Sequence, residues 1–211
     1  MTEPAQAPEV DRVLKRNKGV MTRHVITRLL LGAVLVAAPS VLGSLGAPNH
    51  VLTVLPIVPG IYVLLFLLLR VRHGRRLALC ERVLRNYPLE YRTRVEKRGS
   101  EWRLLGTVYT VKLSTRGQSG AREMRAVNAS VVRRWPAGAE NGGAWFAGDP
   151  AFGGVMVVPG TDDMLFLQPA EWEKYESERA AADPARRDLA ERAGISGLVE
   201  KEPSTLSAIG G

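Results

Sequence analysis

The aspartates in the second half of the chain are the side chains best suited to acid–base or metal chemistry. Asp149 stands in the segment Gly148-Asp149-Pro150, and Asp162 and Asp163 follow Pro159-Gly160-Thr161. Paired carboxylates can bind a divalent cation or act as general acid and base. Each of these aspartates, however, stands in a segment rich in Pro and Gly, where Asp commonly bonds to the local backbone. We therefore interpret them as turn residues, and keep an unrecognised enzyme using Asp149 or Asp162 as an alternative.

Histidine and cysteine offer no second route to catalysis. His24, His50 and His73 all lie within or beside two apolar segments near the N-terminus, so no catalytic triad can be assembled in the second half of the chain. Residues 117–121 read Gly-Gln-Ser-Gly-Ala and depart from the G-x-S-x-G elbow at the last position. Cys80, the single cysteine, is expected to be a buried thiol, with acylation as the alternative. The sequence therefore predicts no catalytic residue, no cofactor and no metal site.

The most distinctive stretch of the sequence is residues 145–150, which read Trp-Phe-Ala-Gly-Asp-Pro and are soon followed by a pair of glycines. Two large aromatic side chains beside a tight turn are typical of a hairpin anchored in a hydrophobic core. The alternative is that Trp145, Phe146 and Asp149 form a surface for a ligand or a protein partner.

Two apolar segments, residues 29–45 and 51–69, predict a transmembrane hairpin. No Lys, Arg, Asp or Glu stands between Arg28 and Arg70. A hydrocarbon core needs roughly 20 apolar residues in a helix, with about 17 as a lower limit. Because residues 46–50 make a short connection, the two helices must be antiparallel neighbours.

Basic residues flank the hairpin on one side only. Residues 1–28 contain six Lys or Arg and residues 70–80 contain four, whereas the connection 46–50 has none. The positive-inside rule then predicts a multi-pass protein of the plasma (inner) membrane with both termini in the cytoplasm. A signal peptide is the rival interpretation of the first segment, and it leaves the large domain on the same side.

Small side chains recur at helical spacing in the first segment, at Ala33, Ala37, Ser40 and Ser44. Such a face allows another helix to approach closely. The second apolar segment is the simplest partner; a subunit of a larger membrane complex is the alternative.

The remainder of the chain predicts a small β domain between helical segments. Residues 70–87 continue the second helix as a juxtamembrane segment that Pro88 ends. Within a cytoplasmic β domain at residues 88–168, apolar residues then recur with a period of two. About six strands are expected, at residues 89–96, 102–113, 124–135, 144–147, 154–158 and 164–167, with a turn at 98–100. Short turns and the absence of interleaved helices favour an antiparallel barrel or sandwich, so the fold class is an α+β membrane protein.

The end of the chain predicts helices and then a tail. Pro169 is suited to begin a helix running to about residue 182, and Asp183 to cap a second helix that Gly194 ends. Residues 169–195 therefore form a helical segment, and residues 196–211 a disordered tail.

Charge carries the remaining functional signal. Residues 70–136 contain seventeen Lys or Arg against five acidic residues. Anionic lipids attract basic residues near the membrane by about 1 kcal/mol each. We expect headgroup contact from four arginines, Arg70, Arg72, Arg75 and Arg76.

The sequence thus indicates a non-enzymatic, membrane-anchored module for anionic-lipid or protein contact. An accessory subunit of a membrane complex and an unrecognised enzyme are the alternatives. Membrane anchoring disfavours nucleic acid as a partner.

Several short motifs are similar to those of a known group of proteins. They are Cys80, Val83-Leu84, Tyr87-Pro88, the segment 145–150 and Pro159-Gly160. Together they resemble uncharacterised two-pass membrane proteins of actinobacteria, over residues 25 to 170. The resemblance implies the two-pass architecture and no particular activity, so it assigns no functional residue.

Overall fold

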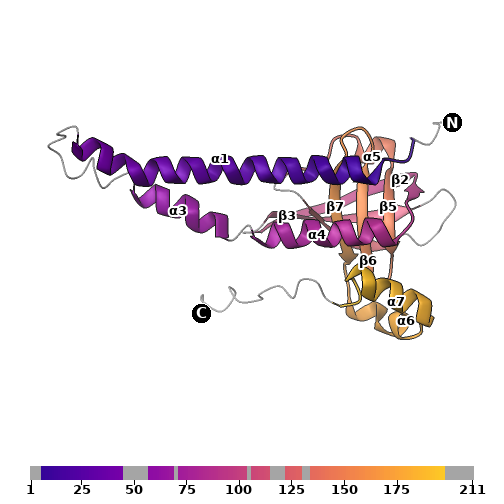
Figure 1. Cartoon of the computed structure of the whole chain (residues 1–211). Coiled ribbons are helices and arrows are strands. Elements are labelled where there is room, and N and C mark those ends of the chain that lie inside the picture. The colour runs from indigo at the N-terminus through magenta and orange to yellow at the C-terminus, as the bar shows by residue number, and fades with distance from the viewer. Residues whose placement is uncertain are drawn as a thin grey trace.

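The computed structural model describes residues 6–44, 57–68, 71–103, 106–114, 122–129 and 134–197. Two helices project from one end of a sheet that carries further helices on its outer face (Figure 1). They are α1 (Val10–Ser44), which lies along the whole length of the molecule, and α3 (Ile57–Leu68). Helix α4 (Val71–Asn86) begins where α3 ends and packs against the sheet. The expected tail at 196–211 lies outside the described residues beyond Gly197.

Helix α1 has two halves with different surroundings. Its first half buries Val13, Leu14 and Asn17 on one face, because Asn17 is four residues after Val13 and three after Leu14. Its second half exposes large apolar side chains, among them Leu30 at 62% and Val34 at 65%. The stretch Val10–Ala38 is long and apolar enough to cross a membrane, and among the described residues it is the only helix that is. The basic residues before the predicted span therefore belong to the same helix as the span.

Helices α1 and α3 pack together through glycine. A Cβ atom at Gly32 would lie 2.8 Å from Leu64, and one at Gly60 would lie 2.9 Å from Val36. Residue numbers rise along α1 as they fall along α3, so the helices are antiparallel. The expected partner face was wrong, because Ala33, Ala37, Ser40 and Ser44 are all exposed. Glycine allows a closer approach than alanine, and it decides which face of α1 is covered.

Seven strands form one antiparallel sheet, in the order β1-β5-β6-β7-β4-β3-β2. They are β1 (Glu90–Arg92), β2 (Arg94–Arg103), β3 (Gly106–Ser114), β4 (Glu123–Asn128), β5 (Ala144–Asp149), β6 (Gly153–Val158) and β7 (Asp163–Pro169). The strands at the two edges, β1 and β2, are separated in the chain by Thr93 alone. Three consecutive residues span only about 7 Å, so the two edges must nearly meet and the sheet is strongly curled. The predicted antiparallel sheet is confirmed.

The expected strands differ from the observed ones in several places. The single strand expected at 102–113 was wrong, because Trp102 and Arg103 end β2 and pair with Thr107 and Gly106 of β3. The run 89–96 is divided at Thr93 into β1 and β2, which gives seven strands in place of six. The predicted turn at 98–100 lies inside β2, where the register with β3 shifts between Lys97 and Gly99. A glycine can accommodate such an irregularity without ending the strand. The strand expected at 124–135 ends at Asn128, and residues 130–133 of that prediction lie outside the described residues.

Hydrophobic residues form two cores, one on each face of the sheet. The inner core lies within the curl and contains Phe146, Met156 and Leu165, each at most 2% exposed. The outer core lies between the sheet and the helices and contains Cys80, Val83 and Val155 among others. Strand β6 is buried at every position because its alternating side chains serve both cores. This explains its continuous apolar sequence.

The C-terminal helices are short and one begins later than expected. Pro169 pairs with Met124 as the last residue of β7, so it does not begin a helix. A 3-10 turn, η1 (Glu173–Tyr175), leads into α6 (Glu176–Ala180). Helix α7 (Pro184–Ala193) begins as predicted, because the Asp183 carboxylate accepts a hydrogen bond from the Arg186 backbone N–H. Its end at Gly194, in the left-handed conformation, is also confirmed.

Candidate functional site

The junction between α1 and the sheet is the point where the apolar helices are fixed to the β domain. The Asn17 side-chain amide donates to the backbone oxygens of Asp162 and Val13, at 2.8 and 2.9 Å. The Arg12 guanidinium lies 3.2 Å from both carboxylate oxygens of Asp162. Asp162 is 7% exposed and has a φ of 51°, which Asp tolerates better than most residues. Helix α1 therefore contacts the β6–β7 turn at both the backbone oxygen and the side-chain carboxylate of Asp162.

Helices α1 and α4 are joined by a second set of polar contacts. The Lys18 ammonium lies 2.7 Å from the Glu81 carboxylate, and Arg85 lies 3.2 Å from Glu81 and 3.3 Å from Asp11. The hydrogen bond from Lys18 lowers the pKa of Glu81 below its ordinary value, and burial opposes that shift. Exposed ion pairs of this kind contribute little stability individually, so they set register more than they hold the helices together.

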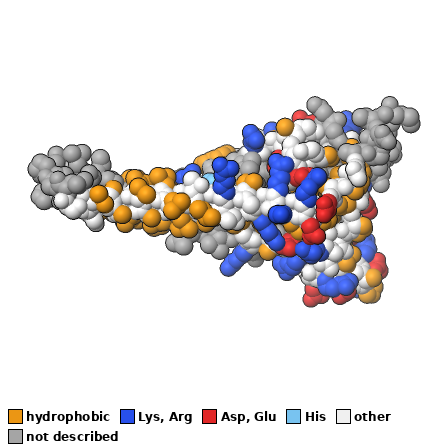
Figure 2. Space-filling model, turned by 45° about the horizontal axis from the view of Figure 1, so that its top comes forward, with side chains coloured by type: hydrophobic (Ala, Val, Ile, Leu, Met, Phe, Trp, Pro, Cys, Tyr) orange, Lys and Arg blue, Asp and Glu red, His pale blue; other side chains and the backbone are white. Residues whose placement is uncertain are grey.

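Basic side chains surround the same junction. Figure 2 shows Lys and Arg gathered where the apolar helices enter the wider domain. Of the four arginines expected to contact headgroups, Arg75 is exposed and Arg76 is 8% exposed. Arg70 and the side chain of Arg72 lie outside the described residues. Sequence reasoning missed Arg23 and Arg28 as headgroup candidates, although both are exposed on α1.

Asp149 lies at the other end of β6, where its carboxylate is bonded within the protein. One of its carboxylate oxygens accepts from the Ala151 backbone N–H at 2.9 Å. The other accepts from Nε and Nη2 of Arg186 at 2.8 and 2.7 Å, which raises the pKa of Arg186. Asp149 thus closes the β5–β6 turn and ties α7 to it. Because Asp149 and Asp162 lie at opposite ends of β6, they cannot act as a carboxylate pair.

Trp145 and Phe146 point to opposite faces of β5. Phe146 is 2% exposed and belongs to the inner core. Trp145 is partly buried, packs against the outer core and lies 5.2 Å from the ring of Tyr91. Of the three residues considered as a binding surface, Phe146 and Asp149 are therefore buried, and Trp145 alone is partly exposed. The aromatic anchor interpretation describes Phe146 well.

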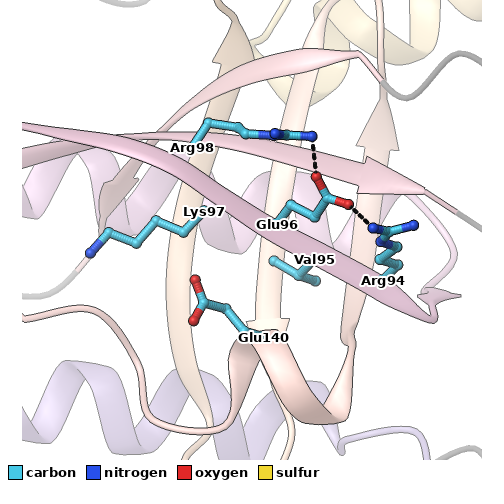
Figure 3. A pocket seen from close by; sticks show the side chains of 6 residues that line it. All are labelled: Arg94, Val95, Glu96, Lys97, Arg98 and Glu140. Atoms are coloured by element: carbon cyan, nitrogen blue, oxygen red, sulfur yellow. Dashed lines mark ion pairs between the residues drawn. The ribbon is translucent and has the colours of Figure 1, made fainter.

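The described residues of the β domain and of the helices beside it line open hollows, of which two are considered. One, of about 310 Å³, lies beside β2 and is lined by Arg94, Val95, Glu96, Lys97, Arg98 and Glu140. Figure 3 shows that Glu96 lies between Arg94 and Arg98 and forms ion pairs with both. The other, of about 560 Å³, lies beside α6 and α7. There the buried Arg179 lies 3.8 Å from the ring of Trp172 and donates to the Ala151 carbonyl oxygen, and burial lowers its pKa.

Metal and thiol chemistry gain no support from the described residues. No group of three or more His, Cys, Asp or Glu in them could bind a metal ion. Cys80 is fully buried as expected, and burial raises its pKa to about 12. A thiol in that state is inert at neutral pH.

Comparison with known proteins leaves the fold and the site as the only guides to function. No protein-family model, curated protein or solved structure matches this chain.

Proposed function

We propose that the chain is a membrane-anchored, non-enzymatic module that holds its β domain against the anionic inner face of the plasma membrane, for lipid or protein contact. The observation that carries this proposal is the continuity of α1. The first half of α1 packs into the β domain. The second half of the same helix is apolar and exposed. The β domain is therefore fixed in orientation to its anchor.

The surface of the projecting helices supports a lipid environment. Large apolar side chains on both are exposed, including Leu30 and Val34 on α1 and Val58, Ile61 and Leu65 on α3. A soluble protein rarely exposes an apolar surface of this extent. We infer that the second apolar segment, residues 51–69, of which α3 is the described part, is a second membrane span. The glycine contacts with α1 make it the partner helix within the hairpin.

The distribution of basic residues supports a cytoplasmic β domain. Arg23 and Arg28 on α1 and Arg75 on α4 are exposed, and each lies within a few residues of an apolar segment in the sequence. Arginines at this level can reach lipid phosphates while their stems cover apolar surface. We propose that these three, with Arg70 and Arg72, make the headgroup contacts. The buried Arg76 belongs instead to the packing of α4.

The first test is a topology measurement in intact cells. Asn49→Cys places a thiol in the predicted connection between the spans, and Ser177→Cys places one on the exposed face of α6. We expect an impermeant maleimide to label Asn49→Cys in spheroplasts, and Ser177→Cys only after the membrane is opened. The unaltered chain should remain unlabelled in both cases because Cys80 is buried.

Two results would contradict the proposal. Release of the protein from membranes by alkaline carbonate would exclude an integral anchor. Labelling of both variants before the membrane is opened would exclude a cytoplasmic β domain.

A second candidate function, accessory subunit of a membrane complex, is favoured by the exposed small-residue face of α1. Ala33, Ala37, Ser40 and Ser44 are not covered by α3. If another subunit packs there, Ala33→Leu with Ala37→Leu should remove a co-purifying partner while the protein stays in the membrane. Val34→Leu with Val41→Leu is the matched control, because it enlarges a neighbouring face. Retention of the partner in the first variant would exclude this role for the face.

A further inference from the structure

Trp102 differs from every other aromatic residue of the β domain in its exposure. It is 68% exposed, near the end of β2. Among the described residues, all other exposed large hydrophobic side chains lie on α1 or α3, the two helices assigned to the membrane. The remaining described tryptophans are partly buried. A tryptophan exposed to this extent departs from the high average burial of its residue type.

The position of Trp102 is the closed end of the β2–β3 hairpin. Trp102 pairs with Thr107, and Arg103 pairs with Gly106. The next strand, β4, pairs with β3 only from Val108 to Lys112. The end of the hairpin consequently extends beyond its neighbour in the sheet.

This hairpin points toward the anchor. In Figure 1, β2 begins at the end of the domain where α1 begins, and the hairpin extends in the direction in which α3 and the apolar half of α1 project. Glu140, on α5 (Ala139–Gly142), lies below Val95 and Lys97 in Figure 3, beside the first half of β2 and away from the hairpin end. With α1 fixed to the domain through Asn17 and Asp162, the hairpin end faces whatever surface the apolar helices enter.

We propose that Trp102 inserts into the interfacial region of the bilayer, as a third membrane contact beside α1 and α3. The inference rests on the proposed membrane anchoring. Tryptophan is favoured at this depth because its ring is largely apolar while its N–H can bond to headgroups or water. A contact away from the axis of α1 also limits rotation of the β domain about that axis, so it sets which face of the domain is turned to the cytoplasm.

The test uses a fluorescent label on the full-length protein in liposomes of phosphatidylcholine and phosphatidylglycerol. Trp102→Cys provides the labelling site for a polarity-sensitive dye, and Cys80 does not compete because it is buried. Glu140→Cys, beside the first half of β2, is the control. We expect the dye at position 102 to shift to the blue and to be quenched by lipids that carry a nitroxide near the headgroup. At position 140 the dye should emit as in water and escape quenching.

The other outcomes separate this inference from the proposed function. Emission as in water at position 102, in a protein that resists extraction by carbonate, would overturn the Trp102 contact and leave the anchor intact. A blue shift without quenching by nitroxide lipids would also overturn it, because a protein surface would then cover the hairpin. Extraction by carbonate would overturn both proposals together.

Discussion

Gly154→Ala is expected to lower the stability of the β domain by about 3 kcal/mol, the upper part of the usual range for overpacking a core. A Cβ atom at Gly154 would lie 2.4 Å from the Ala147 backbone oxygen and 2.6 Å from the Phe146 ring. The backbone oxygen belongs to the adjacent strand, so relief requires β5 and β6 to separate in the middle of the sheet. For a chain of this size, a loss of about 3 kcal/mol corresponds to a midpoint roughly 6–12 °C lower.

Cys80 provides the measurement, because its buried thiol becomes reactive only when the packing of α4 is lost. Thermal unfolding of the full-length protein in detergent can be followed with a fluorogenic maleimide. Gly99→Ala is the matched control, since no atom lies within 4 Å of a Cβ at Gly99. It should unfold close to the unaltered protein. Equal midpoints for the two variants would show that β5 and β6 are not packed as described.

Arg186→Ala is expected to destabilise the domain by about 1–3 kcal/mol, because it leaves the buried Asp149 carboxylate without its charged partner. The carboxylate of Asp149 is 9% exposed, whereas the Arg186 side chain is 43% exposed and can return to water. Asp149→Ala should also destabilise, through loss of the hydrogen bond to Ala151. The double variant should be no less stable than Asp149→Ala alone, since it has no Asp149 carboxylate to be left unpaired.

The same Cys80 assay measures this cycle, with Arg192→Ala as the control. Arg192 pairs with Asp188 on the same exposed helix surface, and its loss should have little effect. Additive effects of Arg186→Ala and Asp149→Ala would contradict the pairing. An Asp149→Ala protein of normal stability would bring back the alternative of a catalytic carboxylate, which needs the residue to be dispensable for folding.

Local patterns predicted the elements of this fold better than their ends. The antiparallel sheet follows from alternation in residues 88–168, and the cap at Asp183 and the stop at Gly194 follow from residue type. The segment 98–100 was misread because Arg-Gly-Ser suits a turn and a bulged strand equally well, and pairing with β3 decides between them. Pro169 was misread for a similar reason, since a proline at the very end of a strand removes at most one hydrogen bond of the ladder.

The site was less predictable, because it depends on contacts between distant parts of the chain. Residues 10–28 read as a basic segment before a span, and no local signal shows that Asn17 binds Asp162. The strand predicted at 102–113 gave no sign that Trp102 is exposed, since alternation assigns faces but cannot show that the end of a hairpin extends beyond its sheet. The choice of Gly32 over Ala33 as the contact with α3 depends on helix rotation, which spacing alone leaves open.

The bond between Asn17 and Asp162 also has a consequence for biosynthesis. The two residues are 145 positions apart in the chain. At 5–20 residues per second, a ribosome needs roughly 7–30 s to cover that interval. During this time α1 has been synthesised and the turn that it binds has not. The face of α1 that carries Val13, Leu14 and Asn17 therefore has no β domain to pack against. The β domain can therefore close only after the whole of α1 has been synthesised.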